Sequence, residues 1–230
     1  MQPSKQRKPA HPDPPAARPL GAAAQATRDG ILRAATKVFA KHGFAGASVE
    51  KISKAARSVD RMIYYYFGSK EGLFVAVLED MYRRMDEAEA AIEFDLSQPR
   101  EALMEVIRFV HRYYRRRPDF VTLINTENLH HGEHIAKSKR AHEYSSRALG
   151  IIASILEEGV AQGLYRPGVR PRDIYLLITS TGYFPTSNQH TLRAFLGDNL
   201  ATDDSMTHWE EFVIDTVLRL VSSGRRPSGR

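Results

Sequence analysis

The chain of 230 residues lacks cysteine altogether and has a single tryptophan. Without cysteine it can form neither disulfides nor thiolate metal sites, which is compatible with a reducing cytoplasm. No apolar run approaches the roughly 20 residues of a membrane-spanning helix. No segment shows the alternating pattern of a β-strand, whereas apolar residues recur at helical spacing through most of the chain. The sequence therefore predicts an all-α protein with no membrane partner.

Proline is concentrated at the start of the chain, where six of the 12 prolines lie within the first 26 residues among Ala, Lys and Arg. This composition predicts a disordered basic arm over 1–26 and a second tail over 223–230. The arm lacks the apolar segment of a signal peptide, so we do not expect export. The remaining length suits a small domain over 27–72 and a larger helical domain over 73–222.

Positive charge is also unevenly spread. The first 70 residues hold 13 Lys and Arg against 4 Asp and Glu, and the remaining 160 hold 20 against 23. A solubilising tail does not explain the difference, because residues 28–70 alone carry 9 basic against 3 acidic side chains. Such asymmetry is typical of a chain whose front end faces nucleic acid.

The segment 48–70 predicts two short helices joined by a turn. The first spans 48–56, with Ser48 as a plausible N-cap, and the second spans about 60–67. Three residues, 57–59, separate them, which is the length of the turn in a helix-turn-helix unit. Polar side chains long enough to reach base edges and phosphates lie on the outer face of the second helix: Asp60, Arg61, Tyr64 and Tyr65.

Two stretches carry a family resemblance: ILRAATKVFAKHGFAGAS from Ile31, and IYYYFGSKEGLF from Ile63. With the helices between them, they resemble the DNA-binding domain of the TetR family of bacterial transcriptional regulators. The turn departs from the family, whose members usually carry Gly-Val-Ser where this chain has Arg57, Ser58 and Val59. Either the turn is rebuilt with Ser58 as a cap, or Arg57 accepts a left-handed conformation at about 1 kcal/mol because it gains a phosphate partner.

The resemblance implies a function as well as a fold. It implies a sequence-specific regulator in the cytoplasm, associated with the nucleoid, and not an enzyme. The leading expectation is a repressor that binds an inverted-repeat operator in double-stranded DNA as a homodimer and is released by a small-molecule effector. A ligand-independent regulator or an activator of the same fold remains an alternative. Two reading helices related by a twofold axis would meet half-sites about 34 to 36 Å apart or a multiple of it.

Ten residues are candidates for DNA contact. Arg61 is the best candidate for reading guanine, whereas Asp60 either caps its helix, which we favour, or accepts from cytosine. Lys70 begins a long helix, where its charge and the helix N-terminus suit a phosphate. The tyrosines are expected mainly to position the backbone and to pack. The full set is Ser48, Val49, Arg57, Asp60, Arg61, Met62, Tyr64, Tyr65, Tyr66 and Lys70.

The last two long helices are candidates for a dimer interface. Their apolar stripes alone fit an intramolecular core equally well. The resemblance favours dimerisation, because family members typically pair these helices in a four-helix bundle. Proline opens the first of the two at Pro171, and we expect Pro185 to close it. The interface candidates are Ile174, Leu177, Ile178, Trp209, Phe212, Val213, Val217 and Leu220.

The resemblance also implies an effector pocket in the larger domain. The candidates are aromatic residues with a few polar anchors, although aromatic residues at helical spacing are also typical of an ordinary core. They are Phe109, Tyr113, Phe120, Asn125, Asn128, Tyr183 and Phe184.

A cluster of histidines follows this region. His130 and His134 stand at i and i+4, a spacing at which a helix can present two imidazoles to zinc. The glutamate is not where HExxH places it, and Gly132 weakens a helix. We therefore expect a hydrogen-bonding surface segment, with no metal and no cofactor, and we rank a metal-dependent hydrolase below the regulator.

Overall fold

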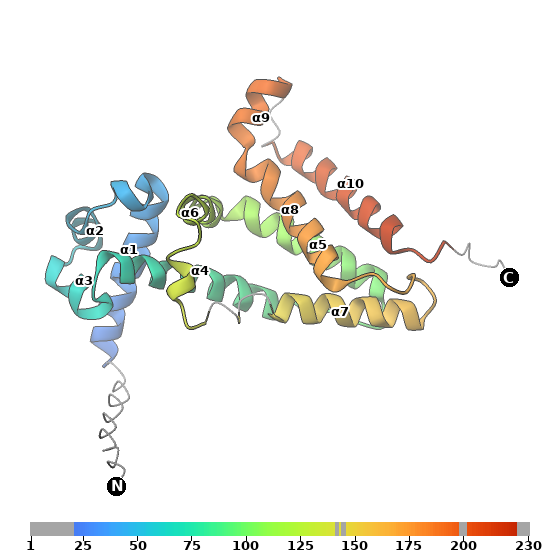
Figure 1. The fold of residues 1–230 in the computed structure, drawn as a ribbon, viewed down its shortest axis with the longest axis horizontal. Helices are drawn as coiled ribbons and strands as arrows, with labels where there is room; N and C mark the ends of the chain where they lie inside the picture. Colours follow the sequence, from blue (N-terminus) through green and yellow to red (C-terminus); the bar gives the residue numbers. More distant parts are fainter. Residues whose placement is uncertain (1–20, 141–142, 144–145, 198–201, 225–230) are drawn as a thin grey trace, which may run out of the picture.

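The computed structural model describes residues 21–140, 143, 146–197 and 202–224. Within them the regular secondary structure is helical, apart from one antiparallel bridge between Tyr165 and Ser222, and turns join the helices. The all-α prediction is therefore confirmed. Figure 1 shows a small head formed by the first three helices and a larger helical body beside it. No helix of the described ranges has the length and apolar character needed to cross a bilayer.

The head consists of α1 (Ala22–Gly46), α2 (Val49–Ala56) and α3 (Asp60–Phe67). Because α1 begins at Ala22, residues 22–26 are helical and do not belong to the expected arm, whose residues 1–20 lie outside the described ranges. The helix is interrupted at Gly43, whose φ of 67° is a conformation that glycine adopts at little cost. The core of the head contains Ile31, Leu32, Ala35, Phe39, Ile52 and Ile63.

Helix α4 (Lys70–Ala90) connects the head to the body. It begins where the Ser69 hydroxyl accepts from the Gly72 N–H at 2.9 Å, an N-cap of the usual kind. Its first turns contribute Leu73, Phe74, Val77 and Leu78 to the core. Its last turn lies in the body, where Glu89 is only 5% exposed. One continuous helix therefore reaches from the head into the body.

The body contains six further α-helices and a short 3-10 turn, η1 (Ile135–Lys137), within the described residues. Helices α5 and α8 pack against each other and against α7, and α10 packs on α5. Proline occupies the first turn of α5, α6 and α8, where its missing N–H costs nothing. The bounds are α5 (Pro99–Arg116), α6 (Pro118–Leu129), α7 (Ser146–Ala161), α8 (Pro171–Ser187), α9 (Gln189–Leu196) and α10 (Asp203–Val221).

The expected helix end at Pro185 is wrong, because α8 continues to Ser187 with the proline inside it. Proline has no N–H for the carbonyl of Thr181, four residues earlier. That carbonyl instead accepts from the indole Nε1 of Trp209 on α10, at 2.9 Å. A contact between distant helices thus satisfies the group that the proline leaves free.

Candidate nucleic-acid interface

Helix α3 has a polar outer face, and its opposite face is held in the core of the head by one buried residue. Ile63 is fully buried in the head, which fixes the rotation of the helix. Arg61 is exposed, and Tyr64 and Tyr65 are 53% and 70% exposed. Large aromatic side chains held this far out of a small core are available to a ligand. Their arrangement on one short helix matches the dimensions of a DNA major groove.

The turn before α3 resolves the alternatives that the sequence left open. Arg57 adopts φ 51° and ψ 43°, a left-handed conformation that is uncommon outside glycine. Its N–H donates to the Lys54 carbonyl at 3.2 Å, and the Ser58 N–H donates to the Ser53 carbonyl at 2.9 Å. This pair of bonds is a Schellman motif. Ser58 therefore does not cap α3, and Arg57 keeps the left-handed conformation.

Asp60 has a different partner from the one expected. The N-cap of α3 is Val59, and no side chain caps that helix. The Asp60 carboxylate instead accepts a hydrogen bond from the hydroxyl of Ser53 on α2. Asp60 therefore ties the supporting helix to the reading helix. The expectation that it caps its own helix is not met.

The start of α2 agrees with the sequence reading. Ser48 is exposed, and its hydroxyl accepts from the Lys51 N–H at 3.1 Å. Val49 is half-buried and packs against the core, so its side chain supports the helix and only its backbone N–H faces outward at a helix terminus. Both residues stand at the N-terminus of α2, where backbone N–H groups are available to an anion.

Lys70 is already engaged within the head. Its Nζ donates to the carbonyls of Phe44 and Ala47 at 3.0 and 3.1 Å, and it lies 4.4 Å from the centre of the Phe44 ring. These carbonyls follow the break at Gly43, so the ammonium caps the end of α1. Lys70 thus has a structural role that the sequence did not reveal. One of its three N–H donors is left over from these two bonds.

Two other candidates are partly withdrawn from the surface. Met62 and Tyr66 are half-buried and pack against the core, so neither projects as freely as Arg61. The Tyr66 ring meets the Tyr65 ring edge-on at 4.9 Å and supports it. Sequence reasoning missed Val59, which is 61% exposed at the tip of the reading helix. An apolar side chain there is suited to contact a thymine methyl group.

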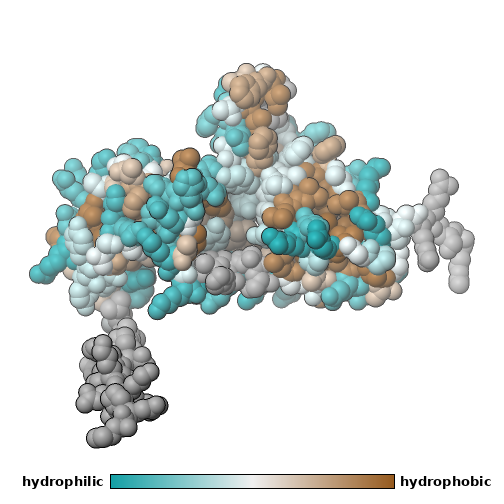
Figure 2. Space-filling view, in the orientation of Figure 1, coloured by the Kyte–Doolittle hydropathy of each residue, from teal (hydrophilic) through white to brown (hydrophobic). Residues whose placement is uncertain are grey.

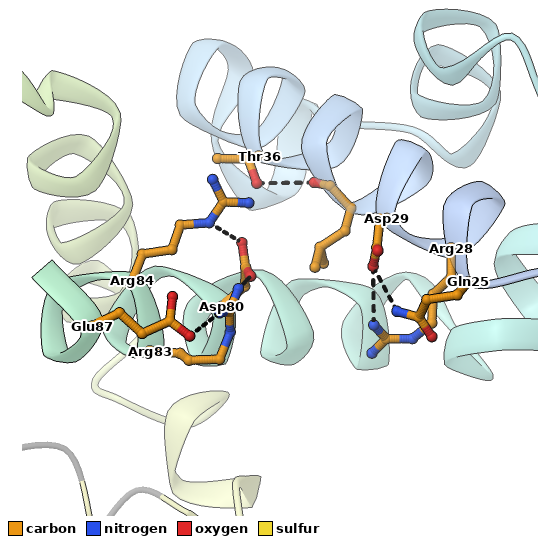
Figure 3. A network of polar contacts seen from close by, with 9 residues as sticks. Gln25, Arg28, Asp29, Thr36, Asp80, Arg83, Arg84 and Glu87 are labelled. Atoms are coloured by element: carbon orange, nitrogen blue, oxygen red, sulfur yellow. Dashed lines mark hydrogen bonds and ion pairs between the residues drawn. The ribbon is translucent and has the colours of Figure 1, made fainter. Parts of the chain in front are cut away.

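A cleft of about 500 Å³ lies between the head and the body. Near its α4 wall, Asp80 accepts from Arg83 and from Arg84 Nε, the latter at 2.7 Å. In Figure 3 both guanidinium groups point at this carboxylate, and Thr36 of α1 lies across from Arg84. The cleft also has basic side chains from the head: Arg33, Lys37 and Arg57. Along this cleft the head and the body are therefore not joined by a continuous apolar contact.

A second cavity, of about 320 Å³, lies within the body between α4, α5, α6, α7 and α8. Its wall is rich in tyrosine and carries two carboxylates on α4. Of the seven expected effector contacts, Phe120, Asn128 and Tyr183 line it. Residues not anticipated from the sequence include Tyr82, Asp86, Glu89, Tyr114 and Tyr175. The two carboxylates, Asp86 and Glu89, lie near the end of α4, for which the sequence predicted no ligand contact.

The other expected effector contacts lie elsewhere. Phe109 and Tyr113 face a separate groove lined by α5 and the end of α4. Asn125 is held by α8, where its amide nitrogen donates to Ser187 at 3.1 Å and its oxygen accepts from the Tyr183 hydroxyl. Phe184 is 55% exposed on the surface. None of these four lines the cavity within the body.

Glu89 is the chemically distinctive group of this cavity. Burial, followed by the nearby charge of Asp86, raises the pKa of Glu89 to about 7. Burial likewise raises the pKa of Tyr114. A carboxyl group that is readily protonated can donate as well as accept a hydrogen bond near neutral pH. The cavity therefore offers several polar anchors within an aromatic wall.

The expected dimer residues divide into two groups. Ile174, Ile178, Val213 and Val217 are at most 3% exposed and belong to the core of the body. Their assignment to a dimer interface was wrong, because a side chain buried within its own chain cannot contact a second copy. Leu177 and Trp209 are half-buried, whereas Phe212 and Leu220 are 55% and 42% exposed.

The histidine segment is not helical. Helix α6 ends at Leu129, and His131 and Gly132 both adopt positive φ values, of 55° and 75°. The turn still brings His130 close to His134, with ring centres 5.1 Å apart. His134 is 1% exposed, so the expectation of a surface segment is wrong for this residue.

Comparisons with known proteins identify two matching family models. The one described as bacterial regulatory proteins, tetR family, matches residues 31–77. The one described as Tetracyclin repressor-like, C-terminal domain, matches residues 99–217. The second covers half of the chain, and the first covers the helix-turn-helix unit and the start of α4.

Individual proteins agree with these matches. The chain is 48% identical over 196 residues to the HTH-type transcriptional repressor NicS of Pseudomonas putida, covering 85% of this chain and 92% of that one. It is 24% identical over 184 residues to an HTH-type transcriptional repressor of Streptomyces coelicolor, covering 79% and 90%.

Among solved structures, HlyIIR, a hemolysin II transcriptional regulator, aligns with a TM-score of 0.51 at 25% identity over 82% of this chain and 97% of that one. A TetR regulator from Haloarcula marismortui shares the fold, with a TM-score of 0.63 at 16% identity over 84% and 98%. The reading helix, the helical body and these matches agree with one another, and they point to a DNA-binding regulator and not to an enzyme. The chain belongs to the TetR family of bacterial transcriptional regulators.

Proposed function

We propose that this regulator is a homodimeric repressor, acting on nucleoid DNA in the cytoplasm, that binds an inverted-repeat operator and is released by a small-molecule effector. The observation that carries the proposal is helix α4. Its first turn packs in the head beside the reading helix, and its last turn carries Asp86 and Glu89 into the wall of the body cavity. A ligand in that cavity therefore touches the element that holds the head.

For DNA reading, the proposal assigns sequence choice to Arg61, supported by Val59 at the tip of α3. A guanidinium suits guanine in the major groove, and an apolar tip suits thymine. Tyr64 and Tyr65 are exposed beside them and would contact the backbone or base edges. Arg57 projects from the turn, where its charge favours a phosphate. Lys70 would contribute through its remaining N–H donor and through the N-terminus of α4.

Pairing of two copies would use the exposed apolar residues of the last three helices. Leu176 and Phe184 on α8 are 52% and 55% exposed, in addition to Phe212 and Leu220 on α10. Helix α9 adds Phe195 and Leu196, and Figure 2 shows apolar surface gathered over this helix. Large apolar side chains clustered on one side of a body typically mark a protein interface. Helices α8 and α10 also contact each other within the chain, as the two helices that each copy contributes to a four-helix bundle do.

The effector would occupy the cavity of about 320 Å³. Tyrosine rings favour a flat, mostly apolar molecule, and Glu89 favours one that carries a hydrogen-bond donor or a positive charge. A ligand that prefers the DNA-incompetent arrangement of the heads by 100-fold would supply about 2.7 kcal/mol of coupling. That coupling is sufficient to relieve repression.

The proposal is tested by binding of the full chain to DNA flanking its own gene, measured by fluorescence anisotropy at several salt concentrations. We expect salt-dependent binding to a fragment containing an inverted repeat and a large loss when one half-site is scrambled. Arg61→Ala should weaken binding and relax base preference at one position by about 1–3 kcal/mol. The exposed Arg100→Ala on α5 is the matched control, because Arg100 belongs neither to the head nor to the proposed pairing face. Equal affinity for the intact and scrambled repeats would refute the dimeric reading.

The effector half of the proposal needs a separate measurement. Small aromatic compounds bearing amine or hydroxyl groups are screened for release of the bound operator fragment. Tyr175→Phe removes one hydroxyl from the cavity wall and should shift the concentration of compound needed for release. The variant Tyr183→Ala enlarges the cavity. If a releasing compound acts equally on the wild type, on Tyr175→Phe and on Tyr183→Ala, the effector binds outside the cavity.

A further inference from the structure

The described part of the chain contains one group of His and carboxylate side chains arranged as metal ligands: His130, Glu133 and His134. Their candidate ligand atoms all lie within 4.8 Å of one another. Glu133 Oε1 lies 3.6 Å from His130 Nδ1 and 4.0 Å from His134 Nε2. In a tetrahedral zinc site with bonds near 2.1 Å, neighbouring ligand atoms are about 3.4 Å apart. The two separations from Glu133 therefore approach those of a formed site.

A buried carboxylate, that of Glu127, orients the His134 imidazole. Its Nδ1 lies 2.8 Å from Glu127 Oε2, and Glu127 is itself 7% exposed. A carboxylate accepts from the N–H of Nδ1, which leaves the lone pair on Nε2, the atom that faces Glu133. Metal-binding histidines are typically oriented by a carboxylate partner in this way.

Glu127 also holds the backbone of the segment. Its Oε1 accepts from the N–H groups of His134 and Ile135, at 2.9 and 2.8 Å. These bonds fix the position of the buried imidazole before any ion arrives. Glu133, by contrast, is exposed, and His130 is half-buried, so both side chains can rotate inward to close the remaining distance.

The cluster lies where the body meets the head. The Phe44 ring of α1 lies 4.4 Å from the His134 ring and 5.5 Å from the His130 ring, centre to centre. Phe74 of α4 meets His134 edge-on at 5.0 Å. An ion that joined His130 to His134 would therefore hold the segment 130–134 against α1 of the head and against the part of α4 that carries Phe74.

We propose that His130, Glu133 and His134 form a binding site for one divalent transition-metal ion, with Zn²⁺ the best match, and that the ion stabilises the junction between head and body. Two imidazoles and one carboxylate are the ligands that zinc accepts in proteins, and three protein ligands leave a fourth position for water. The hard cations Mg²⁺ and Ca²⁺ are a poor match, because they prefer oxygen ligands throughout.

The test uses the full, tag-free chain after dialysis against a chelator. Zn²⁺ is titrated by calorimetry, and bound metal is counted by mass spectrometry. We expect one ion per chain and an increase in the thermal unfolding midpoint that a chelator reverses. Co²⁺ in place of Zn²⁺ should give the visible absorption of a tetrahedral site with nitrogen and oxygen ligands.

Variants decide whether the ion sits at this cluster. His130→Ala and Glu133→Ala remove exposed or half-buried ligands, so both should fold, and each should weaken Zn²⁺ binding by at least about tenfold. His131→Asn is the matched control: His131 is exposed, its left-handed backbone suits asparagine, and Zn²⁺ binding should be unchanged. His134 is not substituted, because loss of a buried partner of Glu127 would disturb the fold itself.

Two results would overturn the proposal: the absence of saturable Zn²⁺ binding to the wild-type chain, or equal Zn²⁺ affinity in wild type, His130→Ala and Glu133→Ala. The second result would place the ion on other surface histidines. None of these measurements involves DNA or an effector. Failure of the metal site would therefore leave the proposed repressor function standing, and failure of operator binding would leave the metal site standing.

Discussion

The indole Nε1 of Trp209 donates a hydrogen bond of 2.9 Å to the carbonyl oxygen of Thr181. Thr181 is four residues before Pro185, so its carbonyl lacks the usual helical donor. The bond joins α10 to α8 at the point where α8 would otherwise carry an unsatisfied acceptor on a half-buried residue. It also places the Trp209 ring parallel to that of Phe212, with centres 5.6 Å apart, at the edge of the proposed pairing face.

Trp209→Phe is therefore expected to destabilise the body. It removes the donor and leaves the Thr181 carbonyl unsatisfied, at a cost of about 1–3 kcal/mol in the free energy of unfolding. Pro185→Ala restores a backbone N–H to the same carbonyl, so the double variant should recover part of the loss. Urea unfolding at fixed protein concentration measures all three. Strict additivity of the two substitutions would show that they do not share the Thr181 acceptor.

Two substitutions of Arg57 distinguish its effect on stability from its effect on DNA binding. Arg57→Gly should be more stable than Arg57→Ala by about 1 kcal/mol, because only glycine takes the left-handed conformation without strain. Both variants lose the same positive charge. If Arg57 contacts a phosphate, both should bind operator DNA more weakly and show a salt slope reduced by about 1. An unchanged salt slope in both variants would mean that the guanidinium does not reach the backbone.

The pairing face is tested by charge. Phe212→Glu and Leu220→Glu place like charges on α10 of both copies and should convert a dimer to a monomer, as measured by sedimentation. Operator binding should then fall, because one reading helix contacts only one half-site. Leu129→Glu is the matched control, since Leu129 is 81% exposed at the end of α6 and outside the proposed face. A dimer that survives both α10 variants would exclude this face.

Glu89 makes the stability of the body depend on pH. Its pKa is raised from 4.5 to about 7 in the folded chain, so its contribution to stability is fully present below pH 4.5 and is lost as the pH rises through 7. Glu89→Gln cannot ionise. Relative to wild type, the variant should gain stability between pH 5 and pH 8, by on the order of 1 kcal/mol. Urea unfolding across this range measures the difference, and the exposed Glu93→Gln should follow the wild-type profile.

An absence of any such pH-dependent difference would show that Glu89 is ionised at no cost in the folded chain. It would then be solvated or paired, and the cavity would favour a positively charged effector over a neutral donor. Effector release measured for Glu89→Gln at pH 8 distinguishes the two cases, because only a cationic ligand loses its counter-charge in the variant.

The bounds of the reading unit follow closely from local sequence. Ser48 caps α2, and α3 spans Asp60–Phe67, as predicted. Helix caps and short apolar periods involve residues only three or four positions apart, so their effect is visible in the sequence itself. The turn over 57–59 could be predicted only in part. Its length was evident from the sequence, but the choice between its two conformations depended on the hydrogen bond from the Ser58 N–H to the Ser53 carbonyl.

Side chains whose partners lie far along the chain were misjudged. Lys70 bonds to carbonyls 23 and 26 residues earlier, and this use of its ammonium leaves no trace in a local pattern. The stripes of α8 and α10 are apolar on more than one side. Periodicity therefore identified them as packing surfaces but not which side meets the body: Ile174 and Val213 face inward, whereas Leu176 and Phe212 face outward.

The sequence by itself determined the all-α architecture and the position of the helix-turn-helix unit, because these rest on caps and apolar periodicity. Its resemblance to the family came from the two motif stretches that begin at Ile31 and Ile63. The tertiary structure alone decided which groups have partners. His134 is buried against Glu127 and Phe44, and Glu89 and Tyr175 line one cavity. The Trp209 indole donates to the Thr181 carbonyl, for which Pro185 has no N–H. These contacts depend on how whole helices pack, a property of three-dimensional complementarity that no short segment encodes.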